Sequence, residues 1–224
     1  MVEGRPRRDL YEHVARVGKA LGNGTRLQLL ELLVQSPRGV VELAEVAGLN
    51  VTTASAGLQA LKSAGLVATE RDGTTIRYRV ADPAVAALYG QLLAVAASNV
   101  ADVDAAARRY LGPDDTEHIN RDELLRRAEA GEVVVLDVRP EAEYAAGHIP
   151  GALSIPLDEL TERIGELPPD LDVVAYCRGT YCTFSHDAVR FLTAEGRRAL
   201  RLADGMLEWK IAGYPSISSA SSVQ

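Results

Sequence analysis

Two cysteines share one short loop, and they are the residues of this chain best suited to covalent chemistry. Cys177 and Cys182 are the only cysteines among 224 residues. Their loop follows an apolar run, 172–175, and precedes a predicted helix that begins near Phe184. A thiol between a strand and a helix meets backbone N–H groups and the positive end of the helix dipole, and both favour the thiolate. The pattern predicts a reactive cysteine here, and Cys177, at the strand end, as the more reactive of the two.

The second thiol raises a further prediction, which depends on how the loop folds. Five extended residues span roughly 17 Å, which exceeds the reach of a disulfide, so the cysteines can join only if the loop curls. Gly179 permits such a path. A persulfide on Cys177 could then be attacked by Cys182, giving a disulfide or a polysulfide bridge. The alternative is that Cys182 is only a small buried apolar residue. The other residues of this predicted active loop are Arg178, Gly179, Thr180 and Tyr181.

The first half of the chain contains a second group of candidate functional residues, whose side chains could form hydrogen bonds or ion pairs with DNA. The apolar spacing predicts short helices at 25–35, 41–47 and 51–64 and then strands at 66–71 and 74–80, joined by an Asp-Gly turn. This order is that of a winged helix-turn-helix, whose third helix enters the major groove. The alternative is that the polar residues are merely solvated. The residues expected to contact bases or phosphates are Asn50, Thr52, Thr53, Ser55, Gln59, Lys62, Arg71, Arg77 and Arg79.

The charge is unevenly distributed between the two halves. Residues 1–100 carry 11 Lys and Arg against 9 Asp and Glu, a net of +2, while residues 101–224 carry 13 against 22, a net of −9. An acidic surface repels phosphate, so nucleic-acid contacts are expected in the first half alone. No membrane span or secretory signal is expected, and two cysteines do not make a disulfide framework. A cytoplasmic protein follows as an expectation.

Other elements in the sequence predict two domains. An amphipathic stretch at 10–21 precedes the three helices, and one long helix is expected from about Pro83 to Tyr110. Beyond it, strands alternate with helices, which predicts an α/β domain with a parallel sheet flanked by helices. The boundaries follow from Gly and Pro punctuation and from a Ser-rich end. The expected divisions are an α+β winged helix-turn-helix domain at 1–110, a linker at 111–116, the α/β domain at 117–215 and a disordered tail at 216–224.

Four segments of the first half together resemble the ArsR family of repressors. They lie at 21–27, 41–44, 58–67 and 77–79. The resemblance implies double-stranded operator DNA as a partner and a homodimer built on the first and last helices. Many family members sense metals, but 39–43 holds no cysteine, the last helix holds no histidine, and His13 stands alone on the first helix. A borderline cation needs several such ligands together, so neither a metal site nor a cofactor is expected.

Three segments of the second half resemble the rhodanese domain. The first covers 136–156, the second is Tyr176-Cys177-Arg178, and the third covers 204–215 with its Gly205 and Trp209. The resemblance implies that Cys177 accepts a sulfane sulfur and becomes a persulfide. Many sulfurtransferases have Arg or Lys at the sixth loop position, where this chain has Cys182. The loss of that cation should weaken turnover of anionic donors.

Several other residues near these motifs have structural interpretations. Asp137 and Arg139 are expected to form a supporting network at the strand ends, with a direct catalytic role as the alternative. Arg178 is expected to pair with an acidic residue and hold the base of the loop. His148 is expected to fix a turn. Trp209 is expected in the core, and His186 is expected at the surface.

Three functions remain open from the sequence. The leading hypothesis is a repressor controlled by reactive sulfur species such as polysulfide or thiosulfate, with Cys177 as the acceptor and Cys182 as the resolving thiol. The second is an active thiosulfate or persulfide sulfurtransferase with an appended DNA-binding domain. The third is a regulator whose second domain is catalytically inert and binds a protein partner. Turnover with thiosulfate separates the second from the others, and sulfide- or polysulfide-dependent release from DNA separates the first from the third.

Overall fold

The computed structural model describes residues 7–113 and 115–219. These residues group into two compact units, and the division falls inside one helix, between Tyr89 and Gly90. The predicted domain limits at 110 and 117 stay predictions, because a division by contacts does not test them.

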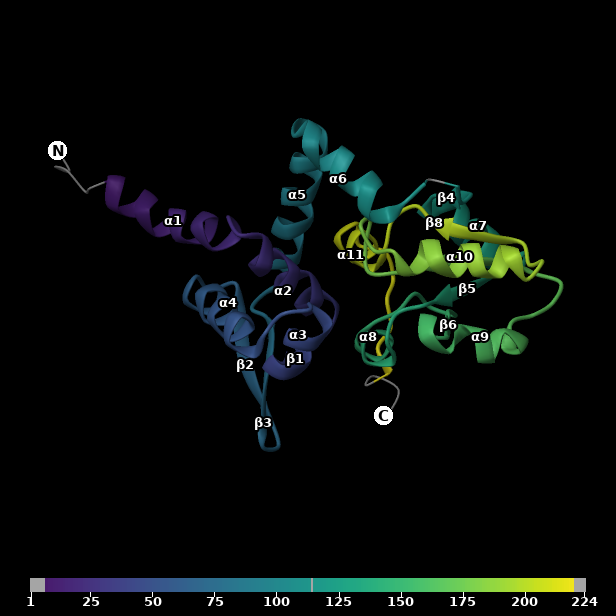
Figure 1. Ribbon diagram of the computed structural model, residues 1–224, viewed down its shortest axis with the longest axis horizontal. Coiled ribbons are helices and arrows are strands. Elements are labelled where there is room, and N and C mark those ends of the chain that lie inside the picture. Colours follow the sequence, from purple (N-terminus) through teal and green to yellow (C-terminus); the bar gives the residue numbers. More distant parts are fainter. Residues whose placement is uncertain (1–6, 114, 220–224) are drawn as a thin grey trace. The chain divides into compact units, whose positions relative to one another are not determined.

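The first unit is a winged helix-turn-helix (Figure 1), as predicted. Its wing is an antiparallel sheet in the order β1-β3-β2, and the hairpin β2–β3 turns at Gly73, which has a φ of 59°. The apolar faces of α2 and α4 bury Leu30, Leu58 and Leu61. The elements are α1 Arg7–Leu21, α2 Gly24–Gln35, β1 Arg38–Gly39, α3 Val40–Val46, α4 Val51–Ser63, β2 Val67–Asp72, β3 Thr75–Val80 and the start of α5 Pro83–Asn99.

The position of α4 is fixed by a cap and by a close approach of two helices. The side chain of Asn50 accepts a hydrogen bond of 2.8 Å from the N–H of Thr53, which satisfies one of the free donors at the helix start. At Gly57 a Cβ atom would lie only 2.8 Å from the side chain of Leu29. Glycine therefore lets α4 pack closely on α2, which sets the orientation of the predicted recognition helix.

The prediction of one long helix from Pro83 to Tyr110 is wrong, because the structure has two helices there. The chain leaves helical geometry at Val100, and α5 and α6 (Ala101–Leu111) meet at an angle of 104°. Asp102 and Asp104 lie in the first turn of α6, where the helix dipole favours negative charge. No single helix in the described part of the chain is long and apolar enough to cross a membrane, although the bent pair α5–α6 reaches the required length and composition together.

The second unit contains the predicted parallel sheet, of five strands in the order β4-β8-β7-β5-β6. Alternate residues of β5 and β7 enter two cores, one shared with α9 and α10 and the other with α7 and α11, so helices flank both faces (Figure 1). The elements are β4 His118–Ile119, α7 Arg121–Glu129, β5 Val133–Asp137, α8 Glu141–Ala146, β6 Leu153–Ser154, η1 Leu157–Glu159, α9 Leu160–Arg163, η2 Ile164–Glu166, β7 Asp172–Tyr176, α10 Phe184–Ala194, β8 Ala199–Leu202 and α11 Met206–Ile211.

The predicted disordered tail, 216–224, is ordered where the structure describes it. Ile217 pairs with His148 in an antiparallel bridge, with N–H···O distances of 2.9 and 3.0 Å. This bridge pairs a single residue on each side, so no alternating apolar pattern in the sequence predicts it. Residues 220–224 lie outside the described residues.

Candidate functional site

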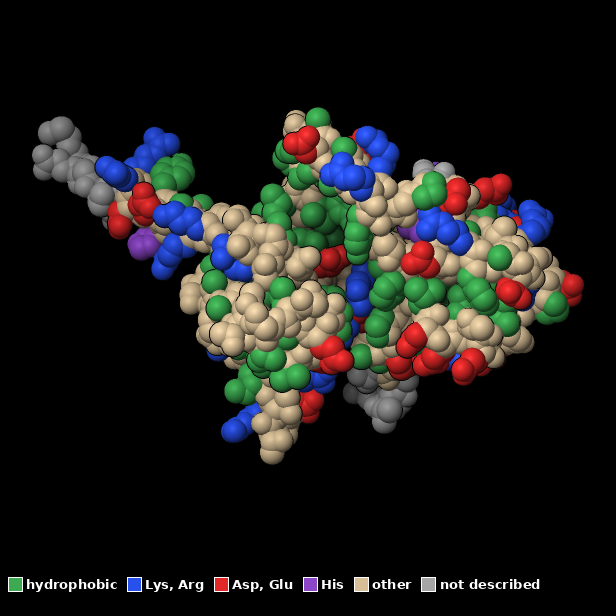
Figure 2. All heavy atoms as spheres, viewed as in Figure 1, with side chains coloured by type: hydrophobic (Ala, Val, Ile, Leu, Met, Phe, Trp, Pro, Cys, Tyr) green, Lys and Arg blue, Asp and Glu red, His purple; other side chains and the backbone are tan. Residues whose placement is uncertain are grey.

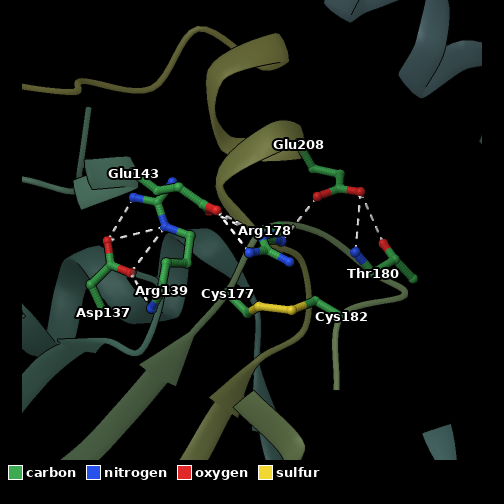
Figure 3. Close-up of a disulfide and its surroundings, with 9 residues drawn as sticks. Asp137, Arg139, Glu143, Cys177, Arg178, Thr180, Cys182 and Glu208 are labelled. Carbon is green, nitrogen blue, oxygen red and sulfur yellow. Dashed lines mark hydrogen bonds and ion pairs between the residues drawn. A yellow bond between two sulfur atoms is a disulfide. The ribbon is translucent and has the colours of Figure 1, made fainter. Parts of the chain in front are cut away.

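The loop after β7 is curled, and a disulfide joins its two ends (Figure 3). The Cα atoms of Cys177 and Cys182 lie 6.2 Å apart, within the normal range for a disulfide. Both cysteines are buried, at 1 % and 7 % exposure, in the core shared with α9 and α10. The curled path therefore brings the two thiols within bonding distance.

The backbone groups of the loop are largely used to hold this shape. The N–H of Cys182 donates to the carbonyl of Gly179 over 3.0 Å, and the N–H groups of Met206 and Leu207 donate to the carbonyls of Cys177 and Arg178 over 2.9 Å each. In addition, the N–H of Thr180 donates to a carboxylate. The sequence predicted that the N–H groups of the loop point at the sulfur. In the disulfide form, the N–H groups of Cys182 and Thr180 donate instead to a carbonyl and to a carboxylate.

Arg178 holds the base of the loop through an ion pair, as predicted. Its guanidinium lies 2.8 Å from Oε1 of Glu143 on α8, and the carboxylate of Glu143 is fully buried. The same guanidinium lies over the ring of Phe184, 5.0 Å from the ring centre, at the start of α10. Arg178 therefore connects the loop to two helices and faces a carboxylate of the protein itself.

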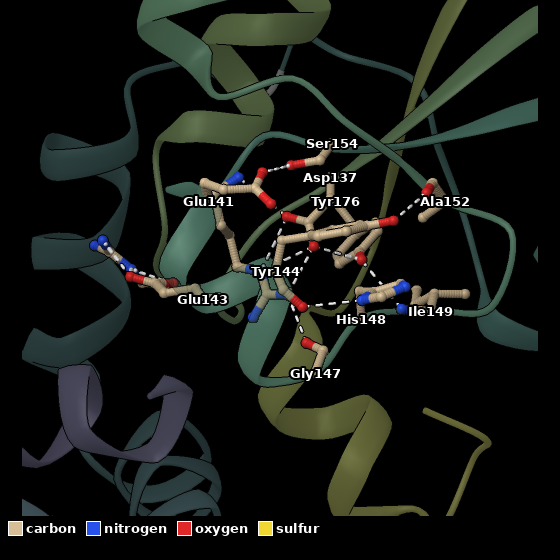
Figure 4. A network of polar contacts seen from close by, with 12 residues as sticks. Asp137, Glu141, Glu143, Tyr144, Gly147, His148, Ile149, Ala152, Ser154 and Tyr176 are labelled. Carbon is tan, nitrogen blue, oxygen red and sulfur yellow. Dashed lines mark hydrogen bonds and ion pairs between the residues drawn. The ribbon is translucent and has the colours of Figure 1, made fainter. Parts of the chain in front are cut away.

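A second buried network lies at the ends of β5 and β7 (Figure 4). Asp137 and Arg139 are fully buried and form an ion pair of 2.6 Å, and the hydroxyl of Tyr176 donates to Asp137 over 2.5 Å. Burial by itself lowers the pKa of Arg139, but the carboxylate of Asp137 outweighs it, so the pKa is raised. Burial, with Asp137 beside it, also raises the pKa of Tyr176. Asp137, Arg139 and Tyr176 thus form a buried polar network at the strand ends, and the supporting role of Asp137 and Arg139 stays a prediction.

Lys210 of α11 lies beside this network. Its ammonium group is close to Gly147, where a Cβ atom would lie 3.1 Å from Nζ. Burial and the positive charge of Arg139 lower the pKa of Lys210 to about 8. No sequence pattern indicates this lowered pKa, because Lys210 occupies an ordinary position in a short helix.

The two histidines near the site have structural surroundings. The Nδ1 atom of His148 lies 2.9 Å from the carbonyl of Tyr144, and the two rings stack 3.7 Å apart, so His148 fixes a turn as predicted. His186 was expected at the surface, and this is wrong, because it is buried in the first turn of α10. An amphipathic helix right after a buried loop turns its first residues inward, which explains the difference. Trp209 is fully buried, as expected.

The predicted DNA-contacting residues of α4 lie in two different surroundings. Asn50, Thr52 and Thr53 are exposed at the start of the helix, although the side chain of Asn50 serves as the cap, and Ser55 is half-buried. Further along the same helix, two long side chains reach the wing. Gln59 donates to the hydroxyl of Tyr78 over 3.1 Å, and Lys62 to the hydroxyl of Thr69 over 2.9 Å.

On the wing, the three predicted arginines also differ in their contacts. Arg71 is exposed near the hairpin turn. Arg77 pairs with Asp72 over 3.2 Å and donates to the carbonyl of Pro37, so it links the hairpin β2–β3 to the residue before β1. Arg79 pairs with Glu70 over 3.2 Å. Among the three, Arg71 is the side chain best placed for a phosphate.

Comparison with known proteins finds two family matches, one in each half of the chain. Residues 23–69 match the model of the bacterial regulatory protein, arsR family, and residues 120–212 match the rhodanese-like domain. The HTH-type transcriptional regulator Rv0324 of Mycobacterium tuberculosis is 56 % identical over 207 residues, which cover 92 % of this chain and 91 % of that protein. The chain belongs to the ArsR family of transcriptional regulators. It carries a rhodanese-like domain after the winged helix-turn-helix.

Two partial relatives match one domain each. A sulfurtransferase of Allochromatium vinosum is 37 % identical over 94 residues, 42 % of this chain and 86 % of that protein. The solution structure of the homodimeric winged helix-turn-helix DNA-binding domain of Mb0332 from Mycobacterium bovis is 48 % identical, with a TM-score of 0.43, and covers 45 % of this chain and 93 % of that one.

Three charged residues of this ArsR-family chain were not singled out from the sequence. Glu208 accepts hydrogen bonds from Thr180, Glu143 pairs with Arg178, and Arg190 bonds to the segment after α6. Glu143 and Glu208 stand inside segments that resemble the rhodanese domain, which was the available signal. Arg190 lies outside those segments, and only the fold brings it to its partners.

Proposed function

We propose that this regulator is a dimeric repressor whose DNA binding is controlled by sulfane sulfur through Cys177 and Cys182. The observation that carries the proposal is the bridged pair itself. The chain's two cysteines lie in one buried loop with their Cα atoms 6.2 Å apart, and the DNA-binding half has no cysteine. A sulfur signal that reaches the DNA must therefore begin in this loop.

The chemistry starts from the reduced pair. The Cys177 thiolate attacks the sulfane sulfur of a persulfide or of thiosulfate, and the thiolate or sulfite of the donor leaves. The Cys182 thiolate then attacks Cys177, and hydrosulfide leaves. The two thiols are oxidised to a disulfide, and the sulfane sulfur is reduced to sulfide. If each cysteine first becomes a persulfide, loss of one hydrogen sulfide leaves a trisulfide bridge instead.

The wing and the helices α1, α4 and α5 supply the proposed DNA-binding and dimer surfaces. The exposed start of α4 and Arg71 face outward for groove and phosphate contacts. The proposed dimer uses apolar side chains that are exposed on α1 and α5, and Figure 2 shows hydrophobic side chains gathered over α5. The largest of these are Leu10, Tyr11, Val14, Leu88 and Val95. A second copy of the chain would bury them.

Coupling between the loop and the helices is supported by contacts within the second unit. The loop runs directly into α10, and Arg190 on that helix donates to the carbonyl of Pro113 over 2.8 Å and to Asp115 over 3.0 Å. Residues of the loop and of α6 also line one cavity of about 410 Å³, among them Tyr181 and Arg108. A change of loop shape can therefore displace α6, which is joined through Val100 to α5, the proposed dimer helix.

A second candidate function is sulfur transfer with turnover. The observation in its favour is the identity with the Allochromatium sulfurtransferase over nearly the whole of that protein. Two features weigh against fast turnover of anionic donors. The sixth loop position is Cys182 in place of a cation, and both sulfurs are buried.

DNA binding of full-length variants tests the proposal. Fluorescence anisotropy with operator DNA is measured for reduced protein and for protein treated with polysulfide. A change of several-fold to roughly a hundredfold in Kd is expected, which corresponds to about 1–3 kcal/mol of coupling. Cys177→Ser should abolish the response. Cys182→Ser should still accept a persulfide but should not transmit it to the DNA. A Cys177→Ser protein that responds normally would refute sulfur sensing by this loop.

A further inference from the structure

A carboxylate from outside the loop lies against its middle residues (Figure 3). Oε1 of Glu208, on α11, accepts hydrogen bonds from the hydroxyl of Thr180 over 3.0 Å and from its N–H over 3.4 Å. Oε2 accepts from the N–H of Gly205 over 3.0 Å. The negative charge of Glu208 therefore contacts Thr180, which is two residues before Cys182, and it accepts a hydrogen bond from one N–H group of the loop.

The position of this carboxylate is built by close packing between the loop and α11. A Cβ atom at Gly179 would lie 3.3 Å from both carboxylate oxygens of Glu208, and a Cβ atom at Gly205 would overlap the backbone of Gly179. The first turn of α11 also donates to the carbonyls of Cys177 and Arg178. Glycine at 179 and 205 is required by this close approach, so the loop and the carboxylate keep a fixed relation.

The nearby arginines Arg178 and Arg121 form their ion pairs with carboxylates other than that of Glu208. Arg178 is the loop's own cation, and it pairs with Glu143. Arg121 donates to the backbone carbonyl of Glu208 over 3.0 Å, while its guanidinium pairs with Asp204 over 3.2 Å. His186 is buried in the first turn of α10 and lines a cavity together with Thr180 and Tyr181. The sixth loop position is Cys182, so it supplies no cation, and the carboxylate of Glu208 lies against the loop. A cation there would attract an anionic sulfur donor, whereas this carboxylate repels it.

We infer that Glu208 is a specificity-determining residue that selects against doubly charged sulfur donors and favours singly charged or neutral persulfides. This inference rests on the proposed function of the loop. The repulsion between Glu208 and a donor grows with the donor's charge, and thiosulfate brings two negative charges where an ionised alkyl persulfide brings one. The same carboxylate disfavours the thiolate at Cys177 and Cys182, and therefore favours the bridged form over the reduced one.

The chemical step is the same for both donors, so charge is the variable that differs. With thiosulfate, the Cys177 thiolate takes the sulfane sulfur and sulfite leaves. With hydroxyethyl persulfide, it takes the terminal sulfur and the thiolate of mercaptoethanol leaves. In both cases attack by Cys182 then closes the disulfide and releases hydrosulfide. Rates of bridge formation can therefore be compared directly, without any need for turnover.

The test measures second-order rate constants of bridge formation for thiosulfate and for hydroxyethyl persulfide, by intact-mass analysis of the full-length reduced protein. Glu208→Gln should speed the thiosulfate reaction about tenfold relative to the persulfide reaction, as one removed unit charge near the loop implies. The pH midpoint of thiol alkylation should fall by about half a unit to one unit. Equal changes for the two donors would overturn the inference, because they would indicate an effect of loop shape alone.

Three controls separate charge from structure. Glu208→Asp keeps the charge and should keep the donor ratio of the parent. Thr180→Val removes the hydroxyl donor and keeps the charge, and it should also leave the ratio unchanged. A shift of the ratio in Thr180→Val as large as that in Glu208→Gln would contradict the assignment. Glu141→Gln removes an exposed carboxylate of α8, and it should change neither the ratio nor the alkylation midpoint.

A measurement on the parent protein covers the case in which Glu208→Gln does not fold. Raising the ionic strength should speed the thiosulfate reaction more than the persulfide reaction, because salt screens the larger repulsion more strongly. Identical salt dependence for both donors would overturn the inference. If the parent forms no bridge with either donor, the proposed function fails. If the parent bridges and its DNA affinity responds while the donor ratio of Glu208→Gln is unchanged, only the selectivity of Glu208 fails.

Discussion

Around the loop, a buried disulfide lies close to buried charged side chains. The pair Asp137–Arg139 is fully buried, and its charges are balanced only within a small network. Such pairs are sensitive to the loss of one partner, because the other charge then remains buried without compensation. These residues therefore act on the loop through the stability of the strand ends that carry it.

Asp137→Asn should destabilise the second unit strongly. Removal of the carboxylate charge leaves Arg139 without its ionic partner, and a cost of about 3–5 kcal/mol in the free energy of unfolding is expected. Trp209, the chain's single tryptophan, reports on this unit, so its fluorescence can follow urea unfolding. Asp158→Asn, at an exposed position, is the control and should change stability by less than about 0.5 kcal/mol. A loss below 1 kcal/mol for Asp137→Asn would show that the pair is not critical.

Lys210 should make the stability of the second unit depend on pH in the alkaline range. Its pKa in the folded protein is about 8, against 10.5 for an ordinary lysine. Between these values the unfolded chain binds more protons, so the free energy of unfolding gains up to about 3 kcal/mol from this group as the pH rises from 8 to 10.5. Below pH 8 the penalty of the buried charge is constant.

Lys210→Met isolates this effect. The variant should be more stable than the parent at pH 7, and the difference should shrink as the pH approaches 10. Urea unfolding at several pH values checks the prediction through the difference between the two proteins, which removes contributions from other groups. A difference that does not vary with pH would mean that Lys210 has an ordinary pKa in the folded state.

At the scale of elements, α10 connects the loop to the segment that follows α6. Arg190 supplies the connection through Pro113 and Asp115. Arg190→Gln should leave bridge formation between Cys177 and Cys182 intact and reduce the response of DNA affinity several-fold. Intact-mass analysis and anisotropy measure the two effects separately.

The control for Arg190 is another arginine of the same unit with only local partners. Arg163→Gln removes a cation that pairs with Glu159 and Glu166 on neighbouring turns. It should change neither bridge formation nor the DNA response. An Arg190→Gln protein with the full response would show that the signal reaches the DNA-binding unit by another route.

The wing of the first unit makes a prediction about DNA affinity alone. Arg71→Ala should weaken binding to all sequences similarly and lower the slope of log K against log salt by about one, because one phosphate contact is lost. Anisotropy titrations over a salt series measure the slope. Arg77→Ala should instead loosen the wing, because Arg77 bonds to Asp72 and Pro37. An unchanged slope for Arg71→Ala would place the DNA elsewhere on this unit.

Elements with strong periodicity could be predicted from the sequence, and elements defined by tertiary contacts could not. The apolar run of β7 and the Asp-Gly turn of the wing specify their structures locally, and both were predicted within a residue or two. The break at Val100 lies in an apolar stretch that any helix would tolerate. The two-residue strands β4 and β6 exist only through their neighbours in the sheet.

The candidate site divides in the same way. The Cys177–Cys182 spacing and the motif around Arg178 identified the loop, since residue type alone limits that chemistry. The partners that hold it, Glu143 and Glu208, come from α8 and α11, and only the fold brings these elements to the loop. The burial of His186 likewise depends on which face of α10 meets the core.

At the scale of the whole molecule, the DNA-binding surface and the thiols are in different parts of the chain. The first hundred residues have a net charge of +2 and no cysteine, and the remainder has a net charge of −9 and both cysteines. This separation means that phosphate contacts and sulfur chemistry do not compete for the same surface. On the proposed function, a sulfur signal therefore has to pass from the second half of the chain to the first.

Bridging of Cys177 and Cys182 is proposed to set DNA affinity, and the extent of bridging and the affinity can both be measured on one sample. Reduced full-length protein is titrated with polysulfide, and each point is divided between intact-mass analysis and anisotropy with operator DNA. The change in DNA affinity should follow the fraction of bridged protein, and a reductant should reverse both together. Fully bridged protein with the DNA affinity of the reduced form would show that the bridge does not control DNA binding.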